Sequence, residues 1–320
     1  MSELQLIDDL VKLARSYKDP KTLLGPGDDA AVIDLSFGPE CITTDQYVEN
    51  QHFRHRWIRP SDLAARCLSA TVSDLAAMGA TPRWLTLAIT LTSDQDRDWL
   101  MNFGQRLGQI LALWNIDLIG GDLTRGERCS ICMTMGGTAQ KGRLLLRRGA
   151  QPDDGIWVSG NLGGSAAAVE YLERGGKNQN LVVDFFSAKH RVLLGLALNR
   201  SGVASSCCDI SDGLLTDLTS LLHEDCPGAL LDLKRLPVSP IATRVSQELA
   251  CSTRPWVLNG GEDFELLFTV PPRREEAMGD LSEALAIPLT RIGTMAETPG
   301  IINVEGRALS PAGWDPFRDS

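Results

Sequence analysis

Segments with the two-residue apolar period of strands alternate along this chain with segments that have the apolar spacing of helices. In the first half, the strand candidates are residues 41–44, 84–91, 118–120 and 130–138, and the helix candidates are residues 62–78 and 96–114. A further amphipathic helix is expected at the start, in MSELQLIDDLVKLARSY. Because helices that alternate with strands cover the faces of a sheet, the pattern predicts an α/β fold.

A basic and polar stretch interrupts this alternation near the middle of the chain. It holds Lys141, Arg143, Arg147 and Arg148 and ends in GAQPDD. After it we expect a strand at 155–159, a small-residue turn at 160–164, helices at 165–173, 191–199 and 273–285, a strand near 229–233 and two short strands at the end. With 320 residues the chain is long enough for two domains. We predict an N-terminal domain over residues 1–148 and a C-terminal α/β domain over residues 149–320.

The formal net charge of −10 at pH 7 restricts the partners of this chain. An acidic protein repels the phosphates of nucleic acids and of anionic lipids, so we expect no nucleic-acid partner and no membrane partner. An anionic small molecule remains compatible if a cation bridges it to the protein. The opening segment does not resemble a signal peptide, and no apolar run approaches the ~20 residues needed to cross a bilayer. We therefore expect a cytoplasmic location.

The eight cysteines show no disulfide framework. Cys129 and Cys132 form a C-x-x-C motif, but a zinc site would need a second pair of ligands. A redox motif would need a helix that begins at the first cysteine, whereas CSICMTMGG alternates like a strand. The better prediction is that both residues are buried thiols.

Acidic residues stand at the ends of predicted elements or inside apolar segments, next to glycine or hydroxyl residues. They are Asp28 and Asp29 after GPG, Asp45 after Thr43 and Thr44, Asp74, Asp122 after IGG, Asp209 and Asp212 in DISDG, and Glu262 and Asp263 after NGG. Two carboxylates about 4 Å apart repel each other by roughly 4 kcal/mol at an effective dielectric constant near 20. Acids that converge therefore need a counter-charge, and Mg²⁺ is the usual choice where phosphates join its ligands.

Each acid also has an ordinary structural explanation. Asp74 can lie on the solvent face of an amphipathic helix, and Asp45 and Asp122 can each be the N-cap of a helix that follows a strand. These explanations suit single residues better than they suit the whole set.

The motifs for phosphate binding are of unequal value. A Walker A loop and the protein-kinase motifs are absent from the sequence. The turn at 160–164 lacks the spacing of a dinucleotide-binding loop, so we interpret it as a close strand–helix turn. Residues 120–126, GGDLTRG, combine exposed backbone N–H groups, a carboxylate and a cation, which suits a polyphosphate. Arg147 is a candidate phosphate clamp, and a solvated charge is the alternative.

A series of motifs follows one order along the chain: GPGDDAAVI, TTDQYVENQHF, SATVSDLAAMGATPRWLTLAITL, LIGGDLTRG, DISDGLLTDL, NGGEDFELLFTV and GWDPF. Together they resemble the thiamine-monophosphate kinases, from about Gly25 to Phe317. The resemblance implies the fold of aminoimidazole-ribonucleotide synthetase, with two α/β domains in each chain. It also implies a homodimer in which the N-terminal sheets of two subunits join into a barrel.

The resemblance further implies roles for individual residues. The metal ligands would be Asp29, Thr43, Thr44, Asp45, Asp74, Asp122, Asp209 and, for a further ion, Asp212. The ATP contacts would be Gly121, Asp122, Arg147 and Ser211. Thiamine monophosphate would contact His52, Glu262 and an aromatic residue near the C-terminus, Trp314 or Phe317. An acid and an indole suit the cationic thiazolium and the flat pyrimidine of thiamine, although Trp314 can also be a tail residue that covers the core.

The implied activity is transfer of a phosphoryl group from ATP to thiamine monophosphate, with several Mg²⁺ ions and without a general base. Two alternatives stay open at this point. One is a sister ATP-dependent enzyme of the same fold, such as a cycloligase. The other is a non-catalytic sensor that binds Mg²⁺ and nucleotide.

Overall fold

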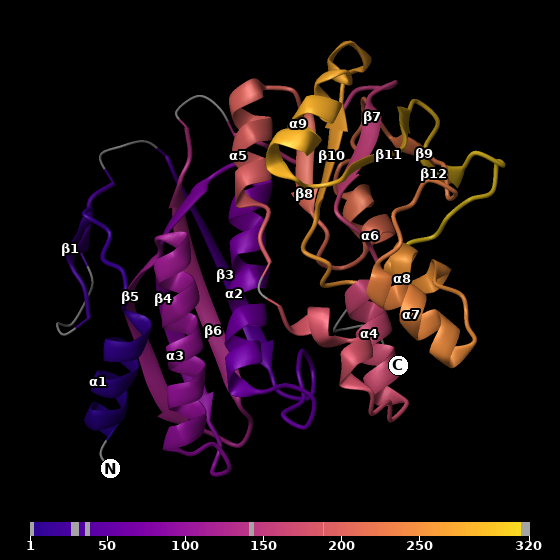
Figure 1. Ribbon diagram of the computed structural model, residues 1–320. Coiled ribbons are helices and arrows are strands. Elements are labelled where there is room, and N and C mark those ends of the chain that lie inside the picture. Colours follow the sequence, from indigo (N-terminus) through magenta and orange to yellow (C-terminus); the bar gives the residue numbers. More distant parts are fainter. Residues whose placement is uncertain (1–2, 27–31, 36–38, 141–143, 188, 315–320) are drawn as a thin grey trace. The chain divides into compact units, whose positions relative to one another are not determined.

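The computed structural model describes residues 3–26, 32–35, 39–140, 144–187 and 189–314 (Figure 1). The chain forms two compact units. The first unit comprises Met1–Leu75, Ala80–Gly142 and Phe186–His190, and the second comprises Ala76–Gly79, Arg143–Phe185 and Arg191–Ser320. The domain border after residue 148 stays a prediction.

The first unit contains a mixed four-stranded sheet. Its helices are α1 (Glu3–Ala14), most of α2 (Pro60–Ala77) and α3 (Arg97–Trp114), and its strands are β1 (Thr22–Leu24), β2 (Val32–Ile33), β3 (Glu40–Val48), β4 (Thr81–Leu91), β5 (Asp117–Arg125) and β6 (Ser130–Thr138). The sheet has the order β3-β6-β4-β5, in which β4 and β5 are parallel and the other pairs are antiparallel. Strands β1 and β2 form a separate antiparallel pair.

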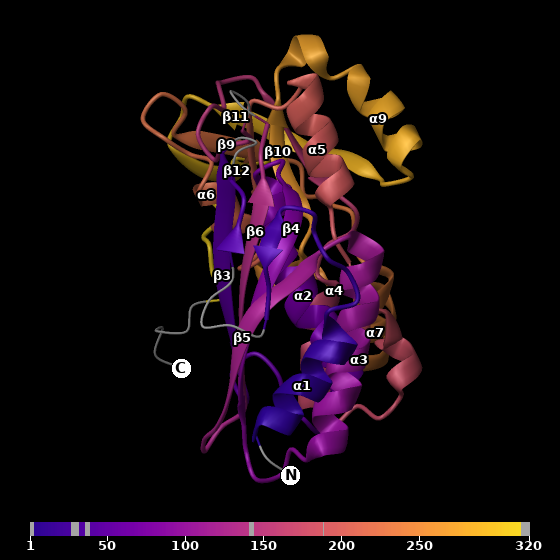
Figure 2. The same cartoon turned by 90° about the vertical axis from the view of Figure 1, so that its left-hand side faces the viewer.

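Helices α1, α2 and α3 lie on the same face of this sheet (Figure 2). On β4 the side chains of Leu87 and Ile89 are buried, whereas the alternating Thr86 and Ala88 are half-exposed. Successive side chains of a strand point to opposite faces, so one face of the sheet is apolar and packs under the helices. No helix of this unit, within its described residues, covers the other face, which we call the bare face.

Strands β3 and β5 are longer than the sequence predicted. Asp45 lies inside β3 and Asp122 lies inside β5, rather than after them. The prediction ended each strand where the apolar residues ended, but β3 pairs with β6 as far as Val48. The interpretation of these two acids as helix N-caps was therefore wrong. Asp122 is tolerated in its strand because it faces away from the helices, whereas Asp45 lies on the face that the helices cover, next to Asp74 of α2.

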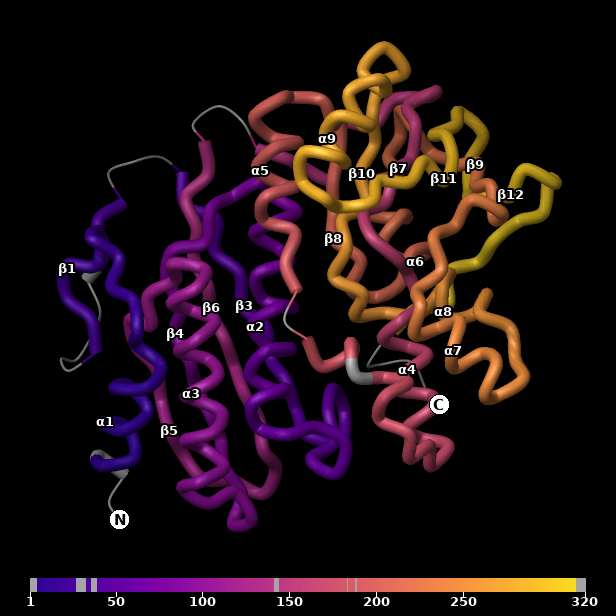
Figure 3. The backbone as a smooth tube through the Cα atoms, viewed as in Figure 1, coloured from indigo at the N-terminus to yellow at the C-terminus, as the bar shows by residue number. Residues whose placement is uncertain are grey.

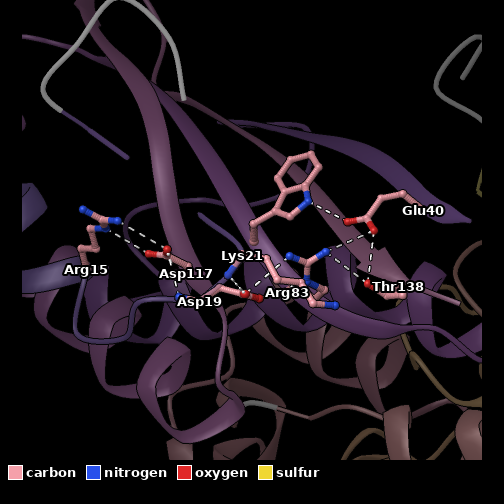
Figure 4. Close-up of polar contacts among 8 residues, drawn as sticks. Arg15, Asp19, Lys21, Glu40, Arg83, Asp117 and Thr138 are labelled. Carbon is pink, nitrogen blue, oxygen red and sulfur yellow. Dashed lines mark hydrogen bonds and ion pairs between the residues drawn. The ribbon is translucent and has the colours of Figure 1, made fainter. Parts of the chain in front are cut away.

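A network of buried charges joins the N-terminal segment to the sheet (Figure 4). The Arg15 guanidinium donates to Asp117, whose other carboxylate oxygen accepts the backbone N–H of Asp19. Arg83 lies between two carboxylates, with Nε 3.0 Å from Asp19 Oδ2 and Nη1 3.5 Å from Glu40 Oε2. Asp117 is fully buried and Arg83 is only 6% exposed. The network thus holds the segment between α1 and β1 against β3, β4 and β5.

The contact between α1 and α3 depends on a glycine. A methyl group added to Gly108 of α3 would collide with the carbonyl oxygen of Leu13 in α1.

We expect Gly108→Ala to lower the free energy of unfolding by about 1–3 kcal/mol, because the helices must separate. Gly279→Ala in α9 (Ala277–Leu285) is the matched control, since no described atom lies within 4 Å of its added methyl group. It should raise stability by up to about 1 kcal/mol through helix propensity. Urea unfolding of both variants measures these changes, and equal effects would contradict the close contact.

The second unit is built on a six-stranded sheet. Its strands are β7 (Gly155–Ser159), β8 (Ser206–Asp209), β9 (Gly228–Leu231), β10 (Leu266–Val270), β11 (Leu289–Ala296) and β12 (Gly300–Asn303). Its helices are α4 (Gly164–Glu173), α5 (Val192–Ser201), α6 (Leu214–Thr219), α7 (Pro240–Leu249), α8 (Arg254–Asn259) and α9, with 3₁₀ turns at Gln179–Leu181, Val183–Phe186 and Pro272–Arg274. The order is β12-β9-β11-β7-β10-β8, and among the described pairs of this sheet only β12–β9 is parallel. Figure 3 shows by colour that β7 lies between strands from much later in the chain.

The predicted elements agree with the structure in type and differ mainly at their ends, but strands β8 and β10 and helices α7 and α8 were not predicted. The strands at 130–138 and 155–159 have the predicted bounds. The helix predicted at 273–285 begins only at Ala277 and follows a short 3₁₀ turn. Pro271 and Pro272 stand at the start of the 3₁₀ turn, where proline is tolerated because the first N–H groups of a helix have no internal partner. In the part of the chain that the structure describes, no helix combines the length and the apolar character that crossing a bilayer requires.

Candidate active site

Two predicted metal ligands meet on the covered face of the first sheet. Asp45 of β3 faces Asp74 of α2, and the Thr43 hydroxyl donates a hydrogen bond to Asp74 Oδ2. Burial and, to a smaller extent, the charge of Asp74 raise the pKa of Asp45 to about 6, although a hydrogen bond from Thr71 acts in the opposite direction. The interpretation of Asp74 as a solvent-facing acid does not hold, because it contacts β3 and is only partly exposed.

One oxygen of this pair has no hydrogen-bond partner. Asp45 Oδ2 is buried and accepts no hydrogen bond from any described residue. A buried carboxylate oxygen without a donor is costly, and a second carboxylate beside it adds repulsion. A hard cation would remove both costs. The donor set of two carboxylates and a nearby hydroxyl contains only oxygen, which fits Mg²⁺.

A complete metal cage is not formed from protein side chains here. Within the described ranges, no group of three or more His, Cys, Asp or Glu residues is close enough to hold a metal ion. Magnesium commonly takes only one or two carboxylates from the protein and completes its shell with water and phosphate oxygens. The Asp45–Asp74 pair therefore suits an ion that arrives with a phosphorylated ligand.

Two other predicted ligands lie on the bare face of the same sheet. Thr44 is exposed, and its hydroxyl is 2.9 Å from that of Thr134. Asp122 is exposed and pairs in register with half-exposed Ala88 of β4. With strands ~4.8 Å apart, three spacings place β3 and β5 about 14 Å from each other. The structure of one chain therefore does not bring Asp122 to Asp45.

Three further predicted residues belong to the first unit. His52 is exposed, and its Nδ1 accepts the backbone N–H of Val48, so the proton of the neutral ring lies on Nε2. Gly121 is required by close packing, because a methyl group there would collide with the carbonyl oxygen of Leu87. Asp29 lies outside the described residues.

In the second unit, the predicted nucleotide contacts lie at the end of β8. Asp209 is buried, and Ser211 and Asp212 follow in a loop. The loop is held by Asp217 of α6, whose Oδ2 accepts the backbone N–H groups of Ser211, Asp212 and Gly213 at 3.0 Å each. Burial raises the pKa of Asp217 to about 6, although these hydrogen bonds act in the opposite direction. Arg147, also in this unit, is exposed.

The predicted thiamine contacts of this unit lie next to that loop. The backbone N–H of Glu262 donates to the carbonyl oxygen of Ser211 at 2.8 Å, and the N–H of Trp314 donates to that of Asp212 at 3.0 Å. Glu262 has a left-handed backbone with φ of 63°, a conformation that often marks functional segments. Trp314 is 48% exposed. Phe317 lies outside the described residues.

The small-residue turn at 160–164 does not serve as a phosphate loop. The Asp263 carboxylate accepts the N–H groups of Gly163, Gly164 and Ser165 at the start of α4. A buried carboxylate thus occupies the position that an anion would take at this helix end. The interpretation of the turn as a strand–helix connection is confirmed.

The cysteines have no role in this site. All eight are free thiols. Cys129 is buried, but Cys132 is only partly buried, so the prediction of two buried thiols was half right. Cys129 immediately precedes β6, and Cys132 lies within it. Among the described residues neither belongs to a group of three or more potential metal ligands, so the zinc interpretation has no support.

Sequence reasoning missed two residues that support the site, Thr71 and Asp217, and it gave no separate role to Asp263, which it had named among the acids. Thr71 hydrogen-bonds Asp45, Asp263 caps α4, and Asp217 organises the loop after β8. A sequence pattern was available for Asp217: it follows Gly213 by four residues, a spacing at which an acid in the first turn of a helix can accept N–H groups of the preceding loop. Nothing in the spacing identified Thr71.

Comparison with known proteins first gives the class of this chain. Two family models match it: AIR synthase related protein, N-terminal domain, over residues 27–139, and AIR synthase related protein, C-terminal domain, over residues 151–304. They define a two-domain protein of the AIR synthase related class.

Whole-chain comparison narrows this class. The chain is 40% identical to thiamine-monophosphate kinase of Escherichia coli over 315 residues, or 92% of each protein. The crystal structure of thiamine-monophosphate kinase from Stenotrophomonas maltophilia has a TM-score of 0.83 and 35% identity, and the match covers 97% of this chain and 98% of that one. AaThiL complexed with AMPPCP and TMP has a TM-score of 0.78 and 25% identity, with 98% and 97% covered. The chain belongs to the thiamine-monophosphate kinase family.

Proposed function

We propose that this protein transfers the γ-phosphoryl group of ATP to thiamine monophosphate, which yields thiamine diphosphate and ADP. One observation carries the proposal: a chain related along 92% of its length to a thiamine-monophosphate kinase keeps an unpartnered, buried carboxylate oxygen on Asp45, a position that the family motif assigns to metal. A sensor without turnover has no comparable support from the relatives.

The reaction is a direct in-line displacement. A phosphate oxygen of thiamine monophosphate forms a bond to the γ-phosphorus of ATP, while the bond from that phosphorus to the β,γ-bridging oxygen breaks and its electron pair leaves with ADP. The attacking oxygen is already anionic at neutral pH, so no side chain has to remove a proton. The protein therefore acts by positioning two anions and by offsetting their repulsion.

In the first unit, Asp45 and Asp74 are the proposed ligands of Mg²⁺. When bound, Mg²⁺ neutralises phosphate charge and stabilises the charge that develops on the transferred group. The hydrogen bond from Thr43 orients the Asp74 carboxylate. The further metal ligands in this unit are proposed from the family motifs: Asp29, Thr44 and Asp122. Gly121 and Asp122 are also proposed to contact ATP, and His52 to contact thiamine monophosphate.

In the second unit, Asp209 and Asp212 are the proposed ligands of further ions, and Ser211 and Arg147 the proposed ATP contacts. Glu262 would pair with the positive thiazolium, and Trp314 would stack on a ring of thiamine. The 48% exposure of Trp314 supports this role, because a buried residue could not stack on a ligand.

A coupled assay for ADP release tests the function. We expect ADP to form from Mg-ATP only when thiamine monophosphate is present, and thiamine diphosphate to form in equal amount. Tight binding of Mg-ATP without turnover would favour the sensor, and turnover with another acceptor would favour a sister enzyme. A cytoplasmic location stays a prediction.

We also propose that two chains pair through the bare faces of their first sheets, which would close into a barrel. Ile42 on this face is 63% exposed, beside the exposed Thr44 and Gln46. A pleated sheet with one face bare exposes apolar area that pairing would bury.

Substitution of Ile42 tests the pairing. We expect the wild-type protein to sediment as a dimer at micromolar concentration, and Ile42→Arg to shift it towards the monomer by at least tenfold in dissociation constant, since a charge would be buried. Leu113→Arg is the matched control, because Leu113 is 76% exposed on α3 in the helical layer. A monomeric wild-type protein, or equal effects of the two changes, would reject this surface.

A further inference from the structure

The loop Ser211–Gly213 directs all three of its N–H groups to a single oxygen. Asp217 Oδ2 accepts them at 3.0 Å each, and Asp217 is only 9% exposed. Charge-assisted hydrogen bonds of this kind are stronger than neutral ones. Because one buried atom is the common acceptor, the three peptide groups cannot turn independently.

Two of these peptide groups have a second bond on their carbonyl side. In the peptide group that joins Ser211 to Asp212, the Ser211 carbonyl oxygen accepts the N–H of Glu262. In the next peptide group, which joins Asp212 to Gly213, the Asp212 carbonyl oxygen accepts the N–H of Trp314. The six atoms of a peptide group lie in one rigid plane. A rotation that breaks the bond to Asp217 therefore also displaces the backbone partner on the other side.

The C-terminal segment is seated on the same helix. The Thr216 hydroxyl accepts the N–H of Gly313 at 3.2 Å, and Asn259 Oδ1 accepts the N–H of Ala312 at 3.0 Å. A methyl group at Gly313 would collide with the carbonyl oxygen of Asp212. Residues 216 and 217 of α6 thus hold both the loop after β8 and the segment that carries Trp314.

We propose that Asp217 is a positioning residue that couples the nucleotide contacts of this unit to its thiamine contacts. Through two rigid peptide planes it sets the orientation of Ser211 and Asp212 on one side and of Glu262 and Trp314 on the other. The role rests on the function proposed above. Asp217 itself contacts no substrate in this scheme; its neighbour Thr216 serves only the C-terminal segment.

Steady-state kinetics with ATP and thiamine monophosphate separate the two residues. We expect Asp217→Asn, which keeps the shape but loses the charge, to raise the KM of both substrates by about tenfold. Thr216→Val should raise the KM of thiamine monophosphate alone, by about fivefold. Asp154→Asn is the matched control: Asp154 is 2% exposed and accepts the N–H of Gln151 at 3.0 Å, in a turn with no predicted site residue. It should leave both KM values unchanged.

Amide hydrogen exchange gives a readout that does not depend on turnover. In Asp217→Asn we expect faster exchange at Glu262 and Trp314 as well as at residues 211–213, with protection elsewhere in the second unit retained. Unchanged exchange at Trp314, or a rise in KM for only one substrate, would overturn the coupling. If Asp217→Asn does not fold, Gly313→Ala decides, because its methyl group would collide with the Asp212 carbonyl oxygen. The coupling then predicts faster exchange at Gly213 as well as at Trp314, and unchanged exchange at Gly213 would overturn it. If the wild-type protein lacks kinase activity, the proposed function is rejected. The hydrogen-exchange result would still decide whether Asp217 couples residues 211–213 to Glu262 and Trp314.

Discussion

Asp45→Asn is expected to lower kcat by at least about 100-fold and, in the absence of Mg²⁺, to make the protein more stable. The two effects have the same cause. Asp45 carries a buried oxygen without a hydrogen-bond partner beside the Asp74 carboxylate, so the charge that would bind a cation is unfavourable without one. Removal of this charge stabilises the metal-free protein, because no unpaired buried charge remains. It also removes the proposed metal ligand, so turnover falls.

The sign of the stability change follows from the pKa of Asp45. It is about 6 in the folded protein, above the usual 3.8, with burial as the larger cause and Asp74 as the second. A raised carboxyl pKa means that the folded state binds the proton more tightly than the unfolded state. Its stabilising contribution is therefore complete below about pH 4 and is lost as the pH rises through 6. The loss amounts to about 3 kcal/mol at pH 7, and Asp45→Asn should recover much of it.

Chemical unfolding from pH 4 to pH 8, with and without Mg²⁺, measures this effect. We expect the stability of the metal-free wild-type protein to fall between pH 4 and pH 6, and the slope to be smaller for Asp45→Asn. Mg²⁺ with AMPPCP should stabilise the wild-type protein and have little effect on the variant. Asp98→Asn is the control, because Asp98 is exposed in the first turn of α3. The assignment fails if Asp45→Asn, or the equivalent Asp74→Asn, keeps near-normal turnover.

Arg83→Met is expected to destabilise the protein by about 3–5 kcal/mol, a large part of a typical folding free energy of ~5–15 kcal/mol. The guanidinium lies between Asp19 and Glu40, and the three side chains are between 6% and 9% exposed. Its removal leaves two buried carboxylates without a cation, and that cost exceeds the value of the ion pairs themselves.

Urea unfolding measures this loss, and two further variants identify its cause. Arg97→Met breaks the pair with Asp9, whose side chains are 46% and 33% exposed, and should cost less than about 1 kcal/mol. Arg83→Met combined with Asp19→Asn and Glu40→Gln should recover most of the lost stability, because no buried charge is left unpaired. If Arg83→Met lowers the free energy of unfolding no more than Arg97→Met does, the charges of this network are accessible to water rather than buried.

The sequence predicted the class of this fold and most of its elements. The strands at 130–138 and 155–159 have their predicted bounds because their apolar periodicity is strong and turn residues stop them sharply. Asp45 and Asp122 were placed after strands instead of within them. Asp122 lies on the bare face and Asp45 lies on the covered face beside Asp74. In one sequence, a polar residue inside a strand is indistinguishable from a residue that ends the strand.

The candidate site, like the fold, has features that the sequence predicted and features that it did not. Asp45, Asp74 and the DISDG segment were identified from the sequence. They are acids next to glycine or hydroxyl residues in apolar surroundings, and those are local features of the sequence. The sequence did not reveal that Asp122 faces the side of the sheet opposite to Asp45, or that Asp217 holds the loop between two sets of contacts.

The sequence by itself thus determined the kinds of elements, the acidic and oxygen-rich character of the site, and the family. Only the tertiary structure decided which of those acids face each other, which oxygen is left without a donor, and which peptide groups are tied together. The reason is that periodicity and motifs depend on neighbours along the chain. Strand register and helix packing instead bring together residues as distant as Asp212 and Trp314.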